Sequence, residues 1–168
     1  MYKSLIIDDE RAVHVVIKKL GKWQEFGIET PLSARNGSEG IDLMRRIKID
    51  IVFVDMNMPI MDGSAFLAQA PEEFPDSKFI VVSGYDDFRY AKTALRANAL
   101  DYILKPIAET ELNKVISRAV ELLDEKHGLH IKNDEDQMQQ RFMQTPQTLP
   151  PAIKTYLEEK CQMKPRLS

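Results

Sequence analysis

The sequence predicts an α/β protein in which five strands form a doubly wound parallel sheet. Two observations support this prediction. Short apolar runs alternate with helical patterns through the first three quarters of the 168 residues, which is typical of repeated βα units. The clearest run, Ile51–Val54, consists of β-branched and aromatic residues without polar alternation. This composition indicates a strand that is buried on both faces, as in a parallel sheet.

The first two βα units are the least regular. Residues 5–7 form an apolar strand, and the helix after it carries one apolar stripe at positions i, i+3, i+4 and i+7. The stripe consists of Val13, Val16, Ile17 and Leu20. His14 is expected to lie exposed on this helix, without a catalytic or ligand role. The second unit is predicted as a weaker strand over residues 28–34, interrupted by Pro31, and a helix with Ser38 as its N-cap.

The third and fourth units are clearer. The strand 51–54 leads through a polar loop into a short helix that ends near Ala70. The fourth strand covers residues 79–82, and either Asp86 or Asp87 caps the helix after it. The three methionines of the loop after the third strand are expected to pack within that loop, because thioethers do not suit Mg²⁺. They are Met56, Met58 and Met61.

The fifth unit closes the predicted domain, and the composition changes after it. A short strand over residues 102–104 precedes a helix with one apolar face. That face consists of Leu112, Val115, Ile116, Ala119, Leu122 and Leu123. We therefore predict a folded domain over residues 1–124. Residues 125–168 are predicted to form a polar linker and a short helix, Ile153–Lys160, with no core of their own.

Charge and cysteine content exclude several classes of protein. The chain has 23 Lys and Arg against 26 Asp and Glu, a net charge of -3, and no visible basic stripe, which argues against nucleic-acid binding by this chain itself. The single cysteine, Cys161, has no partner for an internal disulfide, as is common in a reducing cytosol. No run approaches the roughly 20 apolar residues of a membrane span. We expect a cytoplasmic protein without membrane contact.

Residues with reactive or charged side chains stand directly after four of the predicted strands. Asp8 and Asp9 follow the first strand, and Asp55 follows the third. Ser83 follows the fourth and Lys105 the fifth. Singly, each has an ordinary explanation as a helix cap, a turn residue or a surface lysine. Because ligands of an open parallel sheet bind beyond the carboxyl ends of its strands, their joint placement predicts one functional site.

The chemistry of these side chains favours a magnesium and phosphate site. Neighbouring carboxylates repel one another, so their pKa values rise unless a cation neutralises them. Oxygen ligands on separate loops, with no His or Cys nearby, suit Mg²⁺. In such a site Asp55 attacks a phosphorus atom while Mg²⁺ and Lys105 withdraw charge and the Ser83 hydroxyl donates to a phosphoryl oxygen. The product is an aspartyl phosphate.

The motifs occur in a recognisable order. They are Asp8-Asp9-Glu10, Val54-Asp55-Met56-Asn57-Met58-Pro59, Met61-Asp62-Gly63, Val82-Ser83-Gly84 and Asp101-Tyr102-Ile103-Leu104-Lys105-Pro106. Over about residues 2–124 the chain resembles the receiver domain of two-component response regulators. The resemblance implies a flavodoxin-like sheet with strand order 2-1-3-4-5 and a cis peptide before Pro106.

The resemblance also implies roles for the site residues. Asp55 is the phosphoacceptor and Lys105 pairs with the phosphoryl group. The implied Mg²⁺ ligands are the carboxylates of Asp8, Asp9 and Asp55 and the backbone carbonyl of Asn57. The protein is then a phosphoacceptor switch rather than an enzyme that turns over a separate substrate.

A second set of implications concerns switching and partners. Ser83 and Tyr102 are the expected switch residues, a sensor histidine kinase is the expected phosphoryl donor, and a homodimer through the fourth helix, fifth strand and fifth helix is possible in this family. The stretch Ser83–Lys92 is similar to receivers joined to an AraC-type helix-turn-helix output domain. Because a domain of that kind needs about a hundred residues, we expect the 44 residues of 125–168 to lack it, with DNA binding confined to the missing domain.

Two alternatives remain at this point. One is a receiver that stands alone and acts through protein–protein interaction. The other is an aspartate-nucleophile phosphohydrolase, which also uses Mg²⁺ and an aspartyl phosphate. Such enzymes resemble one another in placing two aspartates two residues apart after the first strand, and Asp8-Asp9-Glu10 lacks that spacing.

Overall fold

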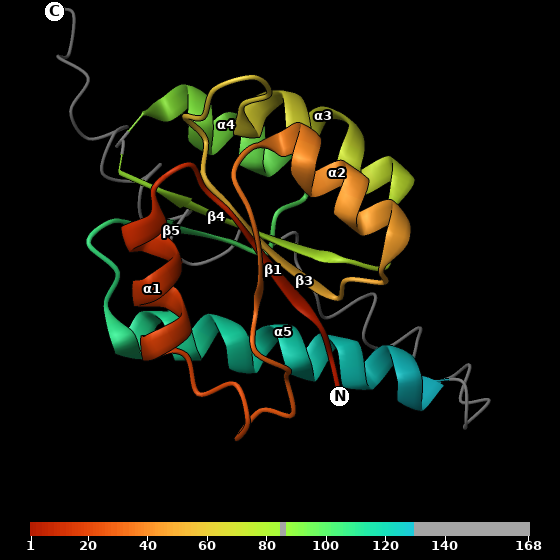
Figure 1. The fold of residues 1–168 in the computed structure, drawn as a ribbon. Coiled ribbons are helices and arrows are strands. Elements are labelled where there is room, and N and C mark those ends of the chain that lie inside the picture. Colours follow the sequence, from red (N-terminus) through yellow and green to blue (C-terminus); the bar gives the residue numbers. More distant parts are fainter. Residues whose placement is uncertain (85–86, 130–168) are drawn as a thin grey trace, which may run out of the picture.

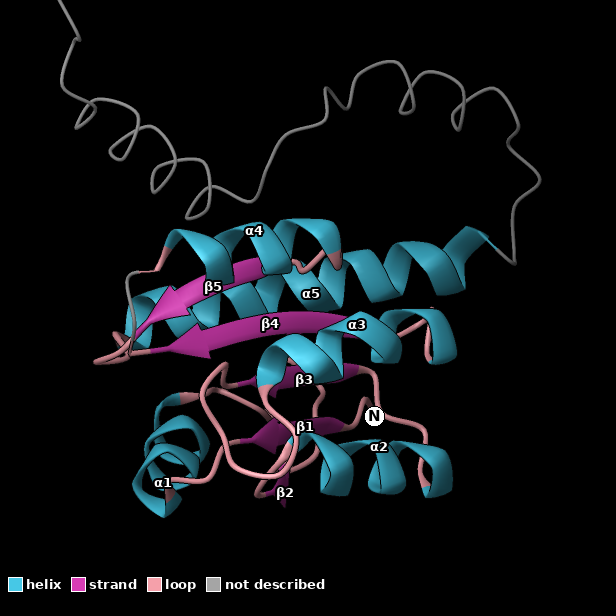
Figure 2. Ribbon diagram, turned by 90° about the horizontal axis from the view of Figure 1, so that it is seen from above, coloured by secondary structure: helices cyan, strands magenta, loops and turns pink. Residues whose placement is uncertain are grey.

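The structure, a computed structural model, describes residues 1–84 and 87–129. One sheet of five parallel strands has the order β2-β1-β3-β4-β5, which confirms the predicted α/β fold and strand order. The strands are β1 (Ser4–Ile7), β2 (Leu32–Ala34), β3 (Ile51–Val54), β4 (Lys78–Ser83) and β5 (Asp101–Leu104). The helices of the described residues are α1 (Arg11–Leu20), α2 (Gly37–Arg46), α3 (Gly63–Glu73), α4 (Phe88–Arg96) and α5 (Glu109–Leu129). Figure 2 shows the strands side by side with their arrowheads pointing the same way.

Helices cover both faces of the sheet. Helices α1 and α5 lie on one face, and α2, α3 and α4 lie on the other (Figure 1). Successive side chains of a strand point to opposite faces, so Leu5 and Ile7 of β1 join the core beside α2–α4, whereas Ile6 joins the core beside α1 and α5. Because both faces of the sheet are covered, every residue of the central strands β1 and β3 is buried, as expected for a parallel sheet.

The second strand is shorter than predicted. Strand β2 covers only Leu32–Ala34, and Ile28 forms an isolated bridge with Tyr2 instead of extending the ladder. Pro31 stands between the two pieces and has no backbone N–H to donate. The interruption anticipated at Pro31 therefore separates a bridge from a strand of three residues.

The helix caps differ from the prediction at α2 and agree with it at α4. Asn36 caps α2, because its side chain accepts a hydrogen bond from the N–H of Glu39, so the assignment to Ser38 is wrong. Ser38 already lies inside the first turn, where its hydroxyl is past the capping position. At α4 the side chain of Asp87 accepts from the N–H of Arg89, as predicted for one of the two candidate residues.

The buried stripe of α1 is rotated relative to the predicted one. Val13 and Ile17 are buried, but Val16 has 39% of its surface exposed and His14 only 8%. The expectation of an exposed His14 is therefore wrong. Both ring nitrogens of His14 have hydrogen-bond partners, and a buried polar group that is hydrogen-bonded carries little penalty.

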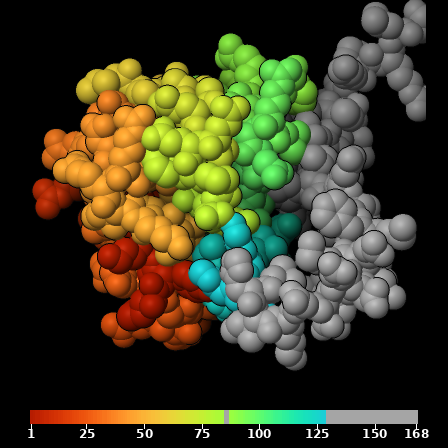
Figure 3. All heavy atoms as spheres, turned by 90° about the vertical axis from the view of Figure 1, so that its right-hand side faces the viewer, coloured from red at the N-terminus to blue at the C-terminus, as the bar shows by residue number. Residues whose placement is uncertain are grey.

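Helix α5 continues without a break through residue 124. Its last turns are anchored to the rest of the fold: Lys126 forms an ion pair with Asp76, and the Tyr2 hydroxyl donates to Asp124. The ring of Tyr2 also stacks on His127, with the ring centroids 5.9 Å apart. Figure 3 shows the cyan end of α5 beside the red first residues of the chain.

Several predictions from the sequence concern residues outside the described ranges. The predicted helix Ile153–Lys160 and the alternative cap Asp86 both lie there. The division of the chain at residue 124 stays a prediction. Within residues 1–84 and 87–129, no helix is both long enough and apolar enough to cross a membrane.

Candidate functional site

The residues predicted for the site stand at the carboxyl end of the sheet. Asp8 follows β1 and Asp55 follows β3, and these two strands are hydrogen-bonded neighbours. Ser83 is the last residue of β4, and Lys105 follows β5. Parallel strands in one sheet present their carboxyl ends on the same edge, which is why residues nearly a hundred positions apart meet there.

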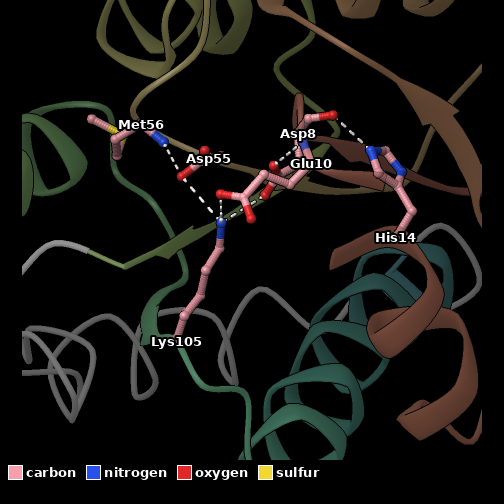
Figure 4. A network of polar contacts seen from close by, with 6 residues as sticks. All are labelled: Asp8, Glu10, His14, Asp55, Met56 and Lys105. Carbon is pink, nitrogen blue, oxygen red and sulfur yellow. Dashed lines mark hydrogen bonds and ion pairs between the residues drawn. The ribbon is translucent and has the colours of Figure 1, made fainter. Parts of the chain in front are cut away.

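Lys105 connects the two buried carboxylates of this edge. Its Nζ atom donates to Asp8 Oδ2 at 2.9 Å and lies 3.7 Å from Asp55 Oδ1 (Figure 4). The same atom lies 3.9 Å from Glu10 Oε1. Asp8 and Asp55 are 1% and 4% exposed, so water screens these charges poorly. The structure thus brings Asp8, Asp55 and Lys105 together.

The loop between β1 and α1 holds Asp8 by its own backbone. Asp8 Oδ1 accepts a hydrogen bond of 2.8 Å from the N–H of Glu10, and Glu10, whose side chain makes no capping bond, is the N-cap of α1. Asp8 therefore forms a local Asx-type turn rather than a helix cap. Asp9 is exposed and lies in the same short loop.

The pKa of Asp55 is raised from 3.8 to about 6, and burial is the largest cause. The negative charge of Asp8 also contributes to this rise, while the charge of Lys105 and the hydrogen bond from the N–H of Met56, 2.9 Å long, oppose it. For Lys105, burial lowers the pKa, but the hydrogen bond to Asp8 and the charge of Asp55 outweigh burial and leave the pKa above 10.5. Because the charged form of Asp55 is costly to bury, a further cation bound beside it would stabilise that form.

An acidic cluster at the same edge fits a hard cation. Carboxylate oxygens of Asp8, Asp9 and Glu10 lie within 4.8 Å of one another, and an all-oxygen donor set suits Mg²⁺. The expectation that no histidine lies nearby is wrong, because His14 Nε2 is 2.7 Å from the carbonyl oxygen of Asp8. That nitrogen is directed at a backbone oxygen, so the donor set of the cluster still consists of oxygens.

The loop after Asp55 packs closely against the backbone of the site. A Cβ atom on Gly63 would lie 2.3 Å from the carbonyl oxygen of Asp55 and 2.7 Å from Met56 Cα, so only glycine allows this approach. Met56 and Met58 are 1% and 7% exposed and belong to the core beside α2–α4, and Met61 packs against that core, so these methionines have packing contacts that extend beyond the loop. The close return of this loop keeps Asp55 between a rigid strand and the start of α3.

Comparison with known proteins identifies the family. The chain matches the response regulator receiver domain over residues 4–117. It belongs to the response regulator receiver family. The peptide bond between Lys105 and Pro106 of this receiver is cis, as the resemblance implied.

Similar receivers occur in longer regulators. The chain is similar to an uncharacterized response regulatory protein of Staphylococcus epidermidis, with 33% identity over 135 residues that cover 80% of this chain and 52% of that protein. It is also similar to the transcriptional regulatory protein HptR of Staphylococcus aureus, with 32% identity over 128 residues, 76% of this chain and 50% of HptR. The chain thus spans about half the length of these curated relatives.

Solved structures show the same fold. The REC domain of AraT, a response regulator from Geobacillus stearothermophilus, has 38% sequence identity and a TM-score of 0.71, and the match covers 75% of this chain and 98% of that one. A response regulator receiver domain protein from Clostridium thermocellum has 30% identity and a TM-score of 0.64, with coverage of 77% and 99%.

The two predicted switch residues of the receiver are buried on neighbouring strands. Ser83 is 0% exposed and Tyr102 is 5% exposed. The carbonyl oxygen of Ser83 accepts a hydrogen bond of 2.9 Å from the N–H of Lys105, so the ends of β4 and β5 are linked next to Lys105. Asn57, two residues past Asp55, is exposed in the loop toward α3. The switching and ligand roles of these residues stay predictions.

Three features of the site were not predicted. Glu10 lies within ion-pair distance of Lys105, and the run Asp8-Asp9-Glu10 was the available signal. Gly63 follows a capping aspartate, and nothing local in the sequence shows that the Asp55 backbone passes beside it. His14 was expected to be exposed, and its contacts with Ser33 and the Asp8 carbonyl have no local signal in the sequence.

Proposed function

We propose that this chain is the phosphorylated switch of a two-component system, in which Asp55 accepts a phosphoryl group from a sensor histidine kinase. Membership of the receiver family supports this proposal. The observation that carries it is the triad at the carboxyl edge, where Lys105 Nζ lies 2.9 Å from Asp8 Oδ2 and 3.7 Å from Asp55 Oδ1. A nucleophilic carboxylate, a second acid and a cation are the parts that phosphoryl transfer to aspartate needs.

The residues of the edge divide the work of the transfer. An oxygen of Asp55 forms a bond to phosphorus while the bond from phosphorus to the donor imidazole nitrogen breaks, and the imidazole leaves with that electron pair. Lys105 neutralises charge on the transferred group. The proposed Mg²⁺ ligands are Asp8, Asp9, Asp55 and the backbone carbonyl of Asn57. When bound, Mg²⁺ supplies positive charge to the phosphoryl oxygens.

Labelling with a small phosphodonor tests this proposal without the kinase. Incubation with acetyl phosphate and Mg²⁺ should add one phosphoryl group, measured by intact-protein mass spectrometry, and Asp55→Asn should remove the label. Asp42→Asn is the matched control, because Asp42 is exposed on α2. Labelling of Asp55→Asn equal to wild type would contradict the assignment, and steady release of phosphate from a phosphate monoester would favour the phosphohydrolase alternative.

We further propose that phosphorylation is read through Ser83 and Tyr102. The Ser83 hydroxyl is the group expected to turn toward the phosphoryl oxygens, and the Tyr102 ring is expected to follow, which changes the surface of α4, β5 and α5. The phosphoryl group shifts this equilibrium only by its different contacts with the two states. Leu104 of β5 and Phe88 of α4 are 40% and 50% exposed, and they are candidates for contacts in a homodimer.

The Ser83→Ala variant separates labelling from its effect. Asp55 should still be labelled in this variant, because the hydroxyl is not the nucleophile, but phosphorylation should no longer promote dimerisation. Sedimentation velocity on labelled and unlabelled protein measures the difference. If labelled Ser83→Ala dimerises as the labelled wild type does, Ser83 does not couple the two events.

We also propose that the output of this receiver is transcriptional. HptR, one of the longer relatives, is named a transcriptional regulatory protein. The likeness of Ser83–Lys92 to receivers joined to AraC-type helix-turn-helix domains favours that type of output. DNA contacts then belong to a domain outside residues 1–168, and the cytoplasm is the predicted compartment.

A further inference from the structure

His14 makes two specific polar contacts that the proposed function has not used. The side chain is 8% exposed. Its Nε2 atom lies 2.7 Å from the backbone carbonyl oxygen of Asp8, and its Nδ1 atom lies 3.0 Å from Ser33 Oγ. Figure 4 shows the ring approaching the Asp8 carbonyl from α1, on the side away from Lys105. A carbonyl oxygen only accepts, so Nε2 carries the hydrogen of this bond.

The contact completes the hydrogen bonding of Asp8. The N–H of Asp8 donates to Ala34 O at 3.1 Å, Oδ1 accepts from Glu10, and Oδ2 accepts from Lys105. The remaining polar atom, the carbonyl oxygen, accepts from His14. All four polar atoms of Asp8 are therefore hydrogen-bonded, and the ring of His14 is the partner of its backbone carbonyl.

The bond from His14 acts on the short segment that carries the acidic cluster. Only Asp8, Asp9 and Glu10 separate β1 from α1, so a rotation of the Asp8 peptide moves the carboxylates on both sides of it. Those carboxylates lie within 4.8 Å of one another although they repel, and repulsion between like charges favours separating them. A hydrogen bond from α1 to the Asp8 carbonyl opposes that separation.

We propose that His14 is a positioning residue, which fixes the Asp8 backbone so that the Asp8 and Asp9 carboxylates are preorganised for a divalent cation. This inference rests on the proposed function. It predicts that the affinity for Mg²⁺ depends on a hydrogen-bond donor at the place of His14 Nε2. Ser33 holds the other side of the ring and sets its orientation.

Two substitutions of His14 by amide side chains of different length distinguish the contact with Asp8 from the contact with Ser33. In His14→Gln the amide nitrogen reaches about as far as Nε2 and can still donate to the Asp8 carbonyl. In His14→Asn the amide reaches only as far as Nδ1, so the contact with Asp8 is lost while a polar group stays on the helix. His14→Leu removes both contacts and replaces the ring by an apolar side chain.

Isothermal titration with MgCl₂ alone measures the effect. The dissociation constant for Mg²⁺ should rise about tenfold in His14→Asn and His14→Leu, the scale usual for a lost partner of a metal ligand, and should stay near wild type in His14→Gln. Ser33 is exposed on β2, and Ser33→Ala should weaken Mg²⁺ binding by a smaller factor. This variant tests the proposal even if a His14 variant does not fold. Ile17→Val, buried one turn further along α1, should lower the thermal midpoint without changing Mg²⁺ affinity.

The outcomes distinguish the two proposals. Equal Mg²⁺ affinity in wild type, His14→Asn and Ser33→Ala, with normal labelling of the wild type, would overturn the role of His14 alone. Loss of affinity in His14→Gln as large as in His14→Asn would also overturn it, because reach would then not matter. A wild-type protein that neither binds Mg²⁺ nor accepts a phosphoryl group would overturn the proposed function as well.

Discussion

Asp55 combines two properties that oppose each other in most carboxylates. It is 4% exposed, and yet its proposed work requires the charged form. Burial and the charge of Asp8 raise its pKa to about 6, so near neutral pH it is an anion held at a cost in stability. That cost is partly offset by the positive charge of Lys105.

The cost can be measured as a pH-dependent difference in stability. Below pH 3.8 Asp55 is protonated in both the folded and the unfolded state, and between pH 3.8 and about 6 only the folded state keeps the proton. The contribution of this group to stability is therefore complete below pH 3.8 and lost as the pH rises through about 6. The amide introduced by Asp55→Asn stays neutral at every pH. The free energy of unfolding of Asp55→Asn at pH 7 without Mg²⁺ should therefore exceed that of wild type by on the order of 2–3 kcal/mol.

Urea unfolding at a series of pH values checks this prediction. The difference between Asp55→Asn and wild type should shrink toward zero below about pH 4. The exposed control Asp42→Asn should follow wild type throughout. If Asp55→Asn is more stable than wild type by the same amount at pH 3.5 and at pH 7, the charge of Asp55 is not the cause of the difference.

At the scale of the elements, local capping decides where helices begin. Asn36 is 9% exposed and accepts from the N–H of Glu39, whereas Ser38 lies inside the first turn of α2. The cap matters for the site as well, because the N–H of Gly37 donates to the carbonyl oxygen of Met61. The start of α2 is thus hydrogen-bonded to the loop that follows β3 and Asp55.

Removal of the Asn36 side chain should lower the stability of the fold, whereas removal of the Ser38 hydroxyl should not. We expect Asn36→Ala to reduce the free energy of unfolding by about 1 kcal/mol, and Ser38→Ala to change it by only a few tenths. Chemical denaturation of the two variants side by side measures the difference. Equal losses in both would mean that the first turn, rather than the Asn36 side chain, determines the stability of the helix.

At the scale of the whole molecule, the proposed cation site would link cation binding to folding. The acidic edge exists only when the strands and loops that carry it are assembled, so a cation that binds there stabilises the folded state. For a concentration one hundred times the dissociation constant, the free energy of unfolding should rise by about 2.7 kcal/mol. Asp9→Asn should reduce this gain, because Asp9 is a proposed ligand.

Thermal unfolding with MgCl₂, compared with NaCl at equal ionic strength, tests the linkage. Mg²⁺ should raise the midpoint of wild type more than NaCl does, and the excess should fall in Asp9→Asn but not in Asp42→Asn. An equal rise in the two salts would indicate general screening of the acidic surface rather than a site.

The fold and the central residues of the site follow from the sequence for one physical reason. Buried parallel strands leave a continuous apolar signal, and the residue after each strand must lie at the carboxyl edge, so Asp8, Asp55 and Lys105 were found without any contact information. His14 and Gly63 were not, because their roles depend on what packs beside them: the Asp8 carbonyl and the Asp55 backbone. Polarity and local spacing carry no information about either partner.

The folded unit extends past the point where the family pattern stops. That pattern ends at residue 117, yet Ala119 and Leu123 are 0% and 2% exposed, and Asp124 binds the hydroxyl of Tyr2. Truncation at residue 117 would uncover apolar surface under the sheet and remove the partner of the second residue of the chain. A fragment chosen for expression or crystallisation should therefore run to the end of α5 rather than to the last matched residue.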